Sequence, residues 1–178
     1  MEDRKMIMDI SRKYYLTILL VSVSASALAS TQQEVKDFYF KQVIGSEATC
    51  QTEFFEKVND VTQLMVTKVA TATLIGKDKD VITYDLKEMM TFMNGKTITI
   101  SSTQTTTFSD SASMMKFDNV SITGLPSKEL ELMFINRYKD RGYSVPYEQV
   151  EISNNEWFHN VNNANGTSQK TVCRLASE

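Results

Sequence analysis

His159 is the only histidine in the chain, so a mechanism that uses imidazole as a general acid or base must use this residue. Its neighbourhood, NNEWFHNVNN, also contains Glu156, and a strand would place His159 and Trp157 on the same face. A serine-histidine hydrolase would need a nucleophilic serine in a tight elbow, and the sequence has no G-x-S-x-G pattern. A histidine at the surface or at the edge of the core is the more common case.

A pair of carboxylates is a second catalytic possibility, because glycosidases use two acids and a cell envelope is rich in glycan. Glu148, Glu151 and Glu156 lie close together in the sequence. Catalysis requires the two carboxyl groups to be about 5 Å or about 6.5 to 9.5 Å apart, and sequence spacing does not give that distance. Solvated strand faces explain the same glutamates equally well.

Methionines offer a different chemistry, the binding of a soft metal ion. They form two clusters, one at Met89, Met90 and Met93 and one at Met114 and Met115. Thioether sulfur prefers Cu(I), so Met90, Met114 and His159 together are candidate ligands. Adjacent residues of a strand point to opposite faces, so one methionine of each adjacent pair at most can face a given site. Methionine as a filler of core gaps is the more frequent explanation.

Cys50 and Cys173 are the two cysteines of the chain. An even number of cysteines in an exported protein predicts a disulfide, here one that joins the two ends of the exported domain. Oxidation would remove Cys50 as a nucleophile, which must be a free thiolate. A zinc site would lack ligands, since one histidine and a disulfide leave too few. We therefore predict a structural disulfide and no cofactor.

The stretch YYLTILLVSVSASALAS, Tyr14 to Ser30, is typical of a cleavable signal peptide. Its uninterrupted apolar run, Leu16 to Val23, is well short of the ~20 residues that a helix needs to cross a bilayer. Two basic residues precede the run, and Ala27-Leu28-Ala29 matches the small-x-small pattern of a signal peptidase site. We predict cleavage after Ala29 and no stable membrane anchor afterwards. The alternative is a buried N-terminal helix.

Removal of residues 1–29 from the chain of 178 residues leaves 149, which suits a single exported domain, residues 30–178. The acids near the start are unusual for a leader, and a later start at Met6 or Met8 is an alternative, with Met8 giving the more ordinary leader. The leader holds four basic and three acidic residues, so the net charge changes from −3 to −4 on cleavage. A mildly acidic chain without a basic run argues against nucleic acid as a partner.

Amphipathic spacing predicts three helices. The first runs from Gln33 to Ile44, and a second begins near Thr52 and continues towards Met65. The third begins after Ser127 as its N-cap and ends at Gly142. Its expected sheet-facing stripe consists of Leu130, Met133, Phe134, Arg137 and Tyr138.

Strands are predicted for the stretches VTKVATATLI, VITYDL, TITI and MMKFDNVSITGL, and later for YEQVEIS, EWFHNV and KTVCRLA. Asn94-Gly95 predicts a hairpin with a type I′ turn. The stretch Ser101–Ser113 is serine- and threonine-rich and is interpreted as an exposed sheet edge, a loop or both. The elements together predict an α+β fold: N-terminal helices, then an antiparallel sheet of about five to seven strands with one helix packed on it.

The absence of a reactive constellation favours a secreted or periplasmic, non-enzymatic protein-binding module, such as an inhibitor, an immunity protein or an accessory subunit of a secretion or surface assembly. Its partner would be another protein of the envelope or outside the cell. We expect contact through Thr103 and Thr105 by strand addition at the sheet edge, and through Trp157 and Phe158 as exposed aromatics. A cell-envelope hydrolase acting on glycan or peptide is the second hypothesis. A periplasmic Cu(I)-binding protein is the third.

Overall fold

The structure, a computed structural model, describes residues 30–140 and 142–176, so the predicted leader and its start lie outside it. The described chain contains nine strands, two α-helices and one 3-10 turn. In chain order these are α1 (Gln32–Phe40), β1 (Glu47–Val58), β2 (Val61–Asp78), β3 (Val81–Phe92), β4 (Thr97–Phe108), β5 (Ala112–Thr123), α2 (Lys128–Asp140), β6 (Tyr143–Pro146), η1 (Tyr147–Gln149), β7 (Val150–Ser153), β8 (Glu156–Asn162) and β9 (Thr167–Leu175).

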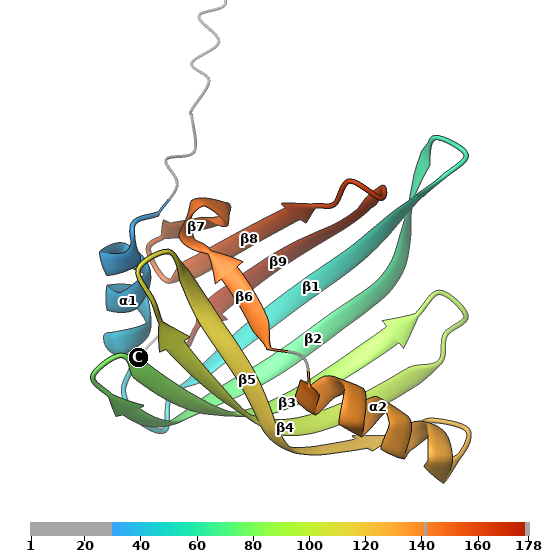
Figure 1. Cartoon of the computed structure of the whole chain (residues 1–178), viewed down its shortest axis with the longest axis horizontal. Helices are drawn as coiled ribbons and strands as arrows, with labels where there is room; N and C mark the ends of the chain where they lie inside the picture. Colours follow the sequence, from blue (N-terminus) through green and yellow to red (C-terminus); the bar gives the residue numbers. More distant parts are fainter. Residues whose placement is uncertain (1–29, 141, 177–178) are drawn as a thin grey trace, which may run out of the picture.

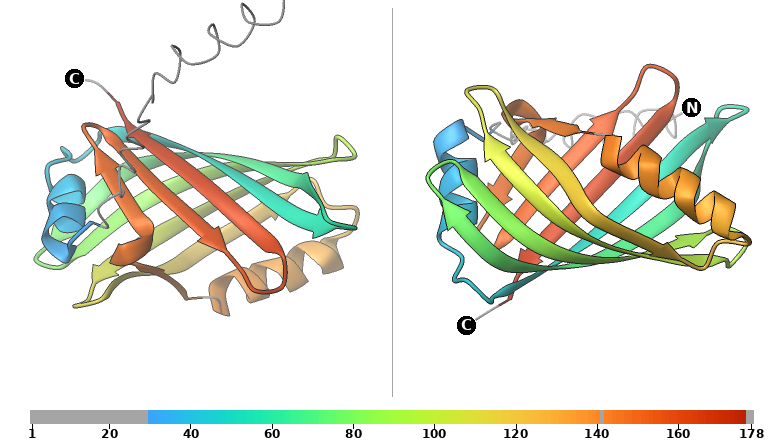
Figure 2. Two further views of the ribbon diagram at one scale, coloured as in Figure 1. Left: turned by 90° about the horizontal axis from the view of Figure 1, so that it is seen from above. Right: turned by 60° about the horizontal axis from the view of Figure 1, so that its bottom comes forward.

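All nine strands belong to one antiparallel sheet in the order β6-β5-β4-β3-β2-β1-β9-β8-β7. The sheet coils into a nearly closed, barrel-like shape, which Figure 1 and Figure 2 show from three directions. The two edge strands, β6 and β7, follow each other in the chain and are linked by η1. β6 pairs with only the first part of β5, from Ala112 to Met115, and α2 packs against β5 as well. Beyond the short β6, α2 lies beside β5 where a strand would otherwise pair. The helix shields this part of the sheet edge.

This architecture shows that the α+β prediction was wrong. The residues predicted as a second helix, from Thr52 towards Met65, form β1, a turn and the start of β2. Asn59 and Asp60 make that turn with positive φ values of 50° and 64°, as a type I′ hairpin turn requires. The helical spacing of apolar residues is outweighed here by pairing of β1 with β2 on one side and with β9 on the other.

The other two predicted helices are present, but α1 ends at Phe40 and not at Ile44, whereas α2 matches its predicted range closely. Thr31 caps α1, accepting a hydrogen bond from the backbone N–H of Glu34, whose carboxylate accepts one from the Thr31 N–H in return. Val35 and Phe38 on α1 are buried in the core, and the helix lies across one end of the barrel (Figure 1). Ser127 Oγ accepts a hydrogen bond from the Leu130 N–H at the start of α2. Neither α-helix in the described ranges is long and apolar enough to cross a membrane.

The predicted hairpin at Asn94-Gly95 joins β3 to β4, but its turn is of another type. Gly95 has a positive φ of 76°, whereas Asn94 does not adopt the left-handed conformation. The Gly95 N–H donates to the Phe92 carbonyl, and the Asn94 side-chain oxygen accepts from the Lys96 N–H. The glycine therefore supplies the left-handed residue, and the asparagine stabilises the turn through its side chain.

Alternation along the strands points every second side chain into the barrel. These inward-facing side chains form three layers. The first apolar cluster lies at the α1 end and includes Leu74, Ile82 and Trp157. The second lies beneath α2 and is built on four buried residues, Ile98, Ile100, Val120 and Ile122. Between them, inward-facing positions carry buried polar side chains, which we call the polar belt: Thr52, Glu88, Ser102, Thr106 and Thr171.

The predicted disulfide is confirmed. Cys50 on β1 lies directly opposite Cys173 on β9, with the two Cα atoms 3.9 Å apart. The bridge links residues 123 positions apart, on the strands whose pairing joins the chain's first strand to its last. Both of its anchors are strands.

We expect the variant Cys50→Ala/Cys173→Ala to keep its sheet but to lose about 2 to 5 kcal/mol of unfolding free energy, because the open chain regains loop entropy when unfolded. Urea unfolding followed by circular dichroism measures the loss, and the reduced wild-type protein serves as the control for the substitutions. An unchanged urea midpoint in both proteins would contradict the assigned role.

Candidate functional site

His159 lies on β8 and faces the barrel interior, where 2% of its surface is exposed. Its Nε2 atom is 3.3 Å from Gln149 Oε1, and its ring lies beside that of Trp157, with 5.6 Å between the centroids. Burial lowers the pKa of His159 to about 4. The imidazole is therefore neutral at pH 7 and is shielded from any substrate in solution.

The second acid-base candidate, Glu156, is not brought to His159. The two residues are three apart on β8, so their side chains leave the sheet on opposite faces. Glu156 lies opposite Arg174 of β9 and forms an ion pair with it on the outer face. The structure thus separates the groups that an envelope hydrolase would combine.

The three candidate copper ligands are also kept apart. Met90 faces inward from β3 and packs on the second apolar cluster. Met114 on β5 is 41% exposed, and the adjacent Met115 is the one that packs on the core. His159 lies near the first cluster, beside Trp157. Within residues 30–140 and 142–176, no group of three or more His, Cys, Asp or Glu side chains is placed to hold a metal ion.

The expected partner-binding residues differ in accessibility. Trp157 is 4% exposed and belongs to the first apolar cluster, so the expectation of an exposed aromatic was wrong for this residue. Phe158, its neighbour, faces the other side of the sheet and is half-buried. Thr103 and Thr105 point outward from β4 and are half-buried.

The expectation of a sheet edge at Ser101–Ser113 was wrong as well. β4 lies between β3 and β5 and pairs with both along nearly its whole length. Its backbone donors and acceptors are therefore already used, and a partner strand cannot add to it. Any contact of Thr103 or Thr105 with a partner must be made through their side chains.

The structure places Thr103 in a hollow on the outer face of the sheet, which we call the outer groove. It has a volume of about 620 Å³. Its lining residues come from β1 to β5 and are Glu47, Thr71, Thr73, Asp85, Leu86, Lys87, Ser101, Ser102, Thr103 and Asn119. Most of these side chains are polar, and the four threonines and serines at odd-numbered positions face outward.

Inside the barrel, Glu88 forms a buried charged contact that we call the inner triad, with Lys68 and Tyr138. Glu88 is 3% exposed; its Oε1 atom lies 2.6 Å from Lys68 Nζ, and its Oε2 atom accepts a hydrogen bond from the Tyr138 hydroxyl. Burial, reinforced by the Glu88 charge, raises the pKa of Tyr138. Because Tyr138 belongs to α2, the inner triad attaches this helix to the barrel wall.

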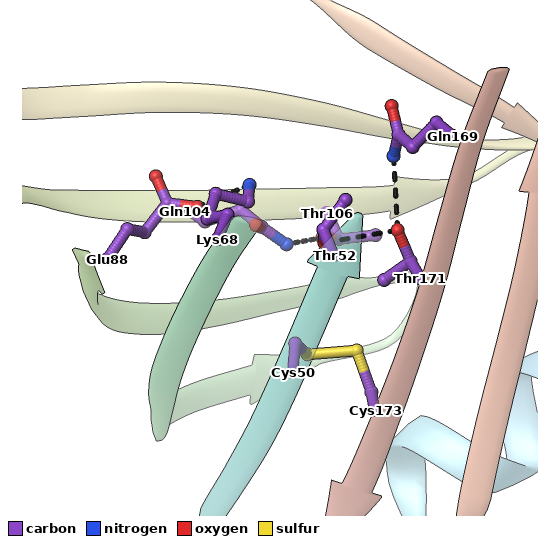
Figure 3. Close-up of a disulfide and its surroundings, with 9 residues drawn as sticks. All are labelled: Cys50, Thr52, Lys68, Glu88, Gln104, Thr106, Gln169, Thr171 and Cys173. Atoms are coloured by element: carbon purple, nitrogen blue, oxygen red, sulfur yellow. Dashed lines mark hydrogen bonds and ion pairs between the residues drawn. A yellow bond between two sulfur atoms is a disulfide. The ribbon is translucent and has the colours of Figure 1, made fainter. Parts of the chain in front are cut away.

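Glu88 is also part of the polar belt, and Figure 3 shows it and Lys68 together with the belt's threonines. Thr52 and Thr171 are hydrogen-bonded across β1 and β9, with 3.2 Å between their hydroxyl oxygens. Gln169 donates to Thr171, and Gln104 donates to Thr106. These bonds compensate much of the cost of placing polar groups between two apolar clusters.

The face that α2 turns towards the barrel is the predicted one only in part. Tyr138, from the predicted stripe, packs on the second apolar cluster, but its partner there is Ile135, and Arg137 of the stripe is exposed. Leu130, Met133 and Phe134, predicted to face the sheet, are 37%, 52% and 37% exposed. These three residues, spaced i, i+3 and i+4, form an apolar strip on the solvent side that we call the α2 strip.

We expect Tyr138→Phe to lower the free energy of unfolding by about 1 to 3 kcal/mol, because Glu88 loses a donor in a buried position. Hydrogen exchange should become faster in α2 before it does in the strands. Tyr143→Phe is the matched control, since the Tyr143 hydroxyl bonds to Gln169 at an exposed site. Equal effects of the two substitutions would show that the inner triad does not hold α2.

The lowered pKa of His159 predicts acid destabilisation. The unfolded chain takes up a proton near pH 6.5 and the folded chain near pH 4, so stability is complete above 6.5 and falls as the pH drops towards 4. By pH 4.5 the loss from this residue should reach about 2 kcal/mol. In urea titrations, the stability difference between wild type and His159→Gln should shrink between pH 7 and pH 4.5. A constant difference would contradict the prediction.

Comparisons of the chain with protein-family models, with curated proteins and with solved structures found no match. No relative's activity therefore bears on the choice between an enzyme and a binding protein. That choice rests on the geometry of the chain itself.

Proposed function

We propose that the chain is a non-enzymatic protein-binding module that acts outside the cytoplasm, in the periplasm or as a secreted protein, and that the α2 strip contacts the partner. The observation that carries the proposal is the orientation of α2. Leu130, Met133 and Phe134 face solvent. On the same helix, Ile135 and Tyr138 face the barrel. An apolar strip that the fold does not bury is a feature of protein interaction sites.

The helix is well suited to present such a strip. Tyr138 and Ile135 fix the inner side of α2 to the barrel, so the outer side is held on a rigid support. A preorganised surface loses little conformational entropy when a partner binds. Glu129 and Arg137 lie among the exposed residues of the helix and supply a polar rim.

The location outside the cytoplasm is supported by two features. The Cys50–Cys173 disulfide is of the kind that persists in oxidising compartments. The sequence of residues 1–29 has the pattern of an export signal. The separation of His159 from Glu156, and of Met90 from Met114, favours binding over hydrolysis or copper carriage.

The proposal predicts that Leu130→Ser/Met133→Ser/Phe134→Ser weakens partner binding by at least about tenfold, the effect of losing a small apolar hot spot. The partner would be captured from the envelope or medium of the exporting host, purified, and titrated by calorimetry against both proteins. The control is Val69→Ser/Met89→Ser, which removes exposed apolar side chains from two paired strands elsewhere on the surface.

Loss of affinity in the α2 variant with full affinity in the control would support the proposal. Equal affinity of both variants for the purified partner would exclude the α2 strip as the contact. Binding of the wild type to lipid vesicles, lost in the α2 variant, would assign the strip to a membrane surface instead of a protein.

A further inference from the structure

The outer groove carries an inference that is independent of α2, since its lining residues come from the strands alone. Its volume of about 620 Å³ falls within the range of roughly 300 to 1,000 Å³ that is usual for small-ligand sites. Unlike most such sites, it is lined mainly by polar side chains. Its ligand must therefore be recognised through hydrogen bonds.

Two irregularities of the sheet lie beside the outer groove. The register between β4 and β5 shifts between Ser101 and Thr103, and that between β2 and β3 shifts between Leu74 and Gly76. Such bulges bend strands and redirect side chains. Within the first bulge, on β5, Asn119 adopts a left-handed conformation with a φ of 51°, and its side chain reaches Thr103 across the strand pair.

Three of the lining residues form a connected set of polar groups. Asn119 Nδ2 donates to Thr103 Oγ1 at 3.3 Å, and Thr103 Oγ1 donates to Asp85 Oδ1 at 3.4 Å. Both contacts are long, so they are weak and leave most of the hydrogen-bonding capacity of the three side chains free. The Asn119 carbonyl oxygen and the remaining lone pairs of Asp85 can still accept hydrogen bonds.

The walls add further donors and acceptors. Thr71, Thr73 and Ser101 each carry a hydroxyl, which can donate one hydrogen bond and accept others. Lys87 adds an ammonium donor, and it lies between Thr71 and Ser101 in the register of β2, β3 and β4. Hydroxyl groups therefore flank the charged groups on neighbouring strands, about 4.8 Å apart across the sheet.

The charge balance of the groove limits the class of ligand. Glu47 and Asp85 are acidic and Lys87 is basic, which leaves an excess of one negative charge. This excess disfavours phosphorylated, sulfated or uronic ligands. A neutral sugar carries many hydroxyl groups that both donate and accept hydrogen bonds, and it has no charge. It therefore suits this lining.

We propose that the outer groove binds a neutral glycan, with Asp85, Asn119 and Thr103 as the central hydrogen-bonding groups. Asp85 accepts from sugar hydroxyls, Asn119 accepts through its carbonyl oxygen, and Lys87 and the wall hydroxyls donate to ring and hydroxyl oxygens. The proposed activity is binding of the sugar, not its cleavage.

The test begins with an array of neutral and anionic oligosaccharides probed with the full exported chain. Neutral hexasaccharides of glucose and of N-acetylglucosamine, together with the strongest neutral hit of the array, are then titrated by calorimetry. We expect saturable binding of a neutral glycan, weakened by at least about tenfold in Thr103→Val and in Asp85→Ala. Thr107→Val is the matched control, because it lies on the same strand and face, outside the groove, and should change the affinity by less than about twofold.

A readout that needs no variant is the change in amide and methyl NMR signals of the wild-type protein during titration. Shifts centred on Thr71, Ser101 and Asn119 support the proposal. Binding of anionic glycans alone, the absence of binding to any neutral glycan, or shifts centred on α2 would each overturn it.

Discussion

The pairing of β1 with β9 is the interaction on which the rest of the structure depends. Strands β1 to β5 pair one after another as hairpins, β6 joins β5 after α2, and β7 to β9 form a second series. β1 joins the two series by pairing with β2 on one edge and with β9 on the other. Without this contact the sheet would be two separate pieces and would not enclose the core. The disulfide lies at this junction.

Features that depend on neighbouring residues could be predicted from the sequence. Thr31 and Ser127 mark the starts of the two helices through local hydrogen bonds, and Gly95 marks a turn through its backbone freedom. The pairing of two cysteines in an exported chain followed from their number alone. For the caps and the turn, the residue that gives the signal lies within the element that it predicts. For the disulfide, each cysteine has a single possible partner.

Features that depend on distant strands could not be predicted. β1 presents Ala48, Cys50 and Thr52 to the interior, and these small or polar residues hide the apolar alternation by which a strand is recognised. The face of α2 that packs inward was decided by Glu88, which is 50 residues away from Tyr138 in the sequence. One signal of the outer groove was present in the sequence, the unbroken alternation of hydroxyl residues along β4. A strand of that length is typical of a sheet interior and not of an edge.

The inner triad has a consequence for strand alignment. Alternation of apolar and polar residues forbids a slip of one residue between β2 and β3, because every side chain would change faces. A slip of two residues preserves the faces and is forbidden by no hydrophobic pattern. In the direction that pairs Lys68 with Phe92 in place of Met90, such a slip would, however, move Lys68 about 6.6 Å further from Glu88 and leave a buried carboxylate without its cation. The buried ion pair therefore disfavours slips in that direction, which the apolar residues leave open.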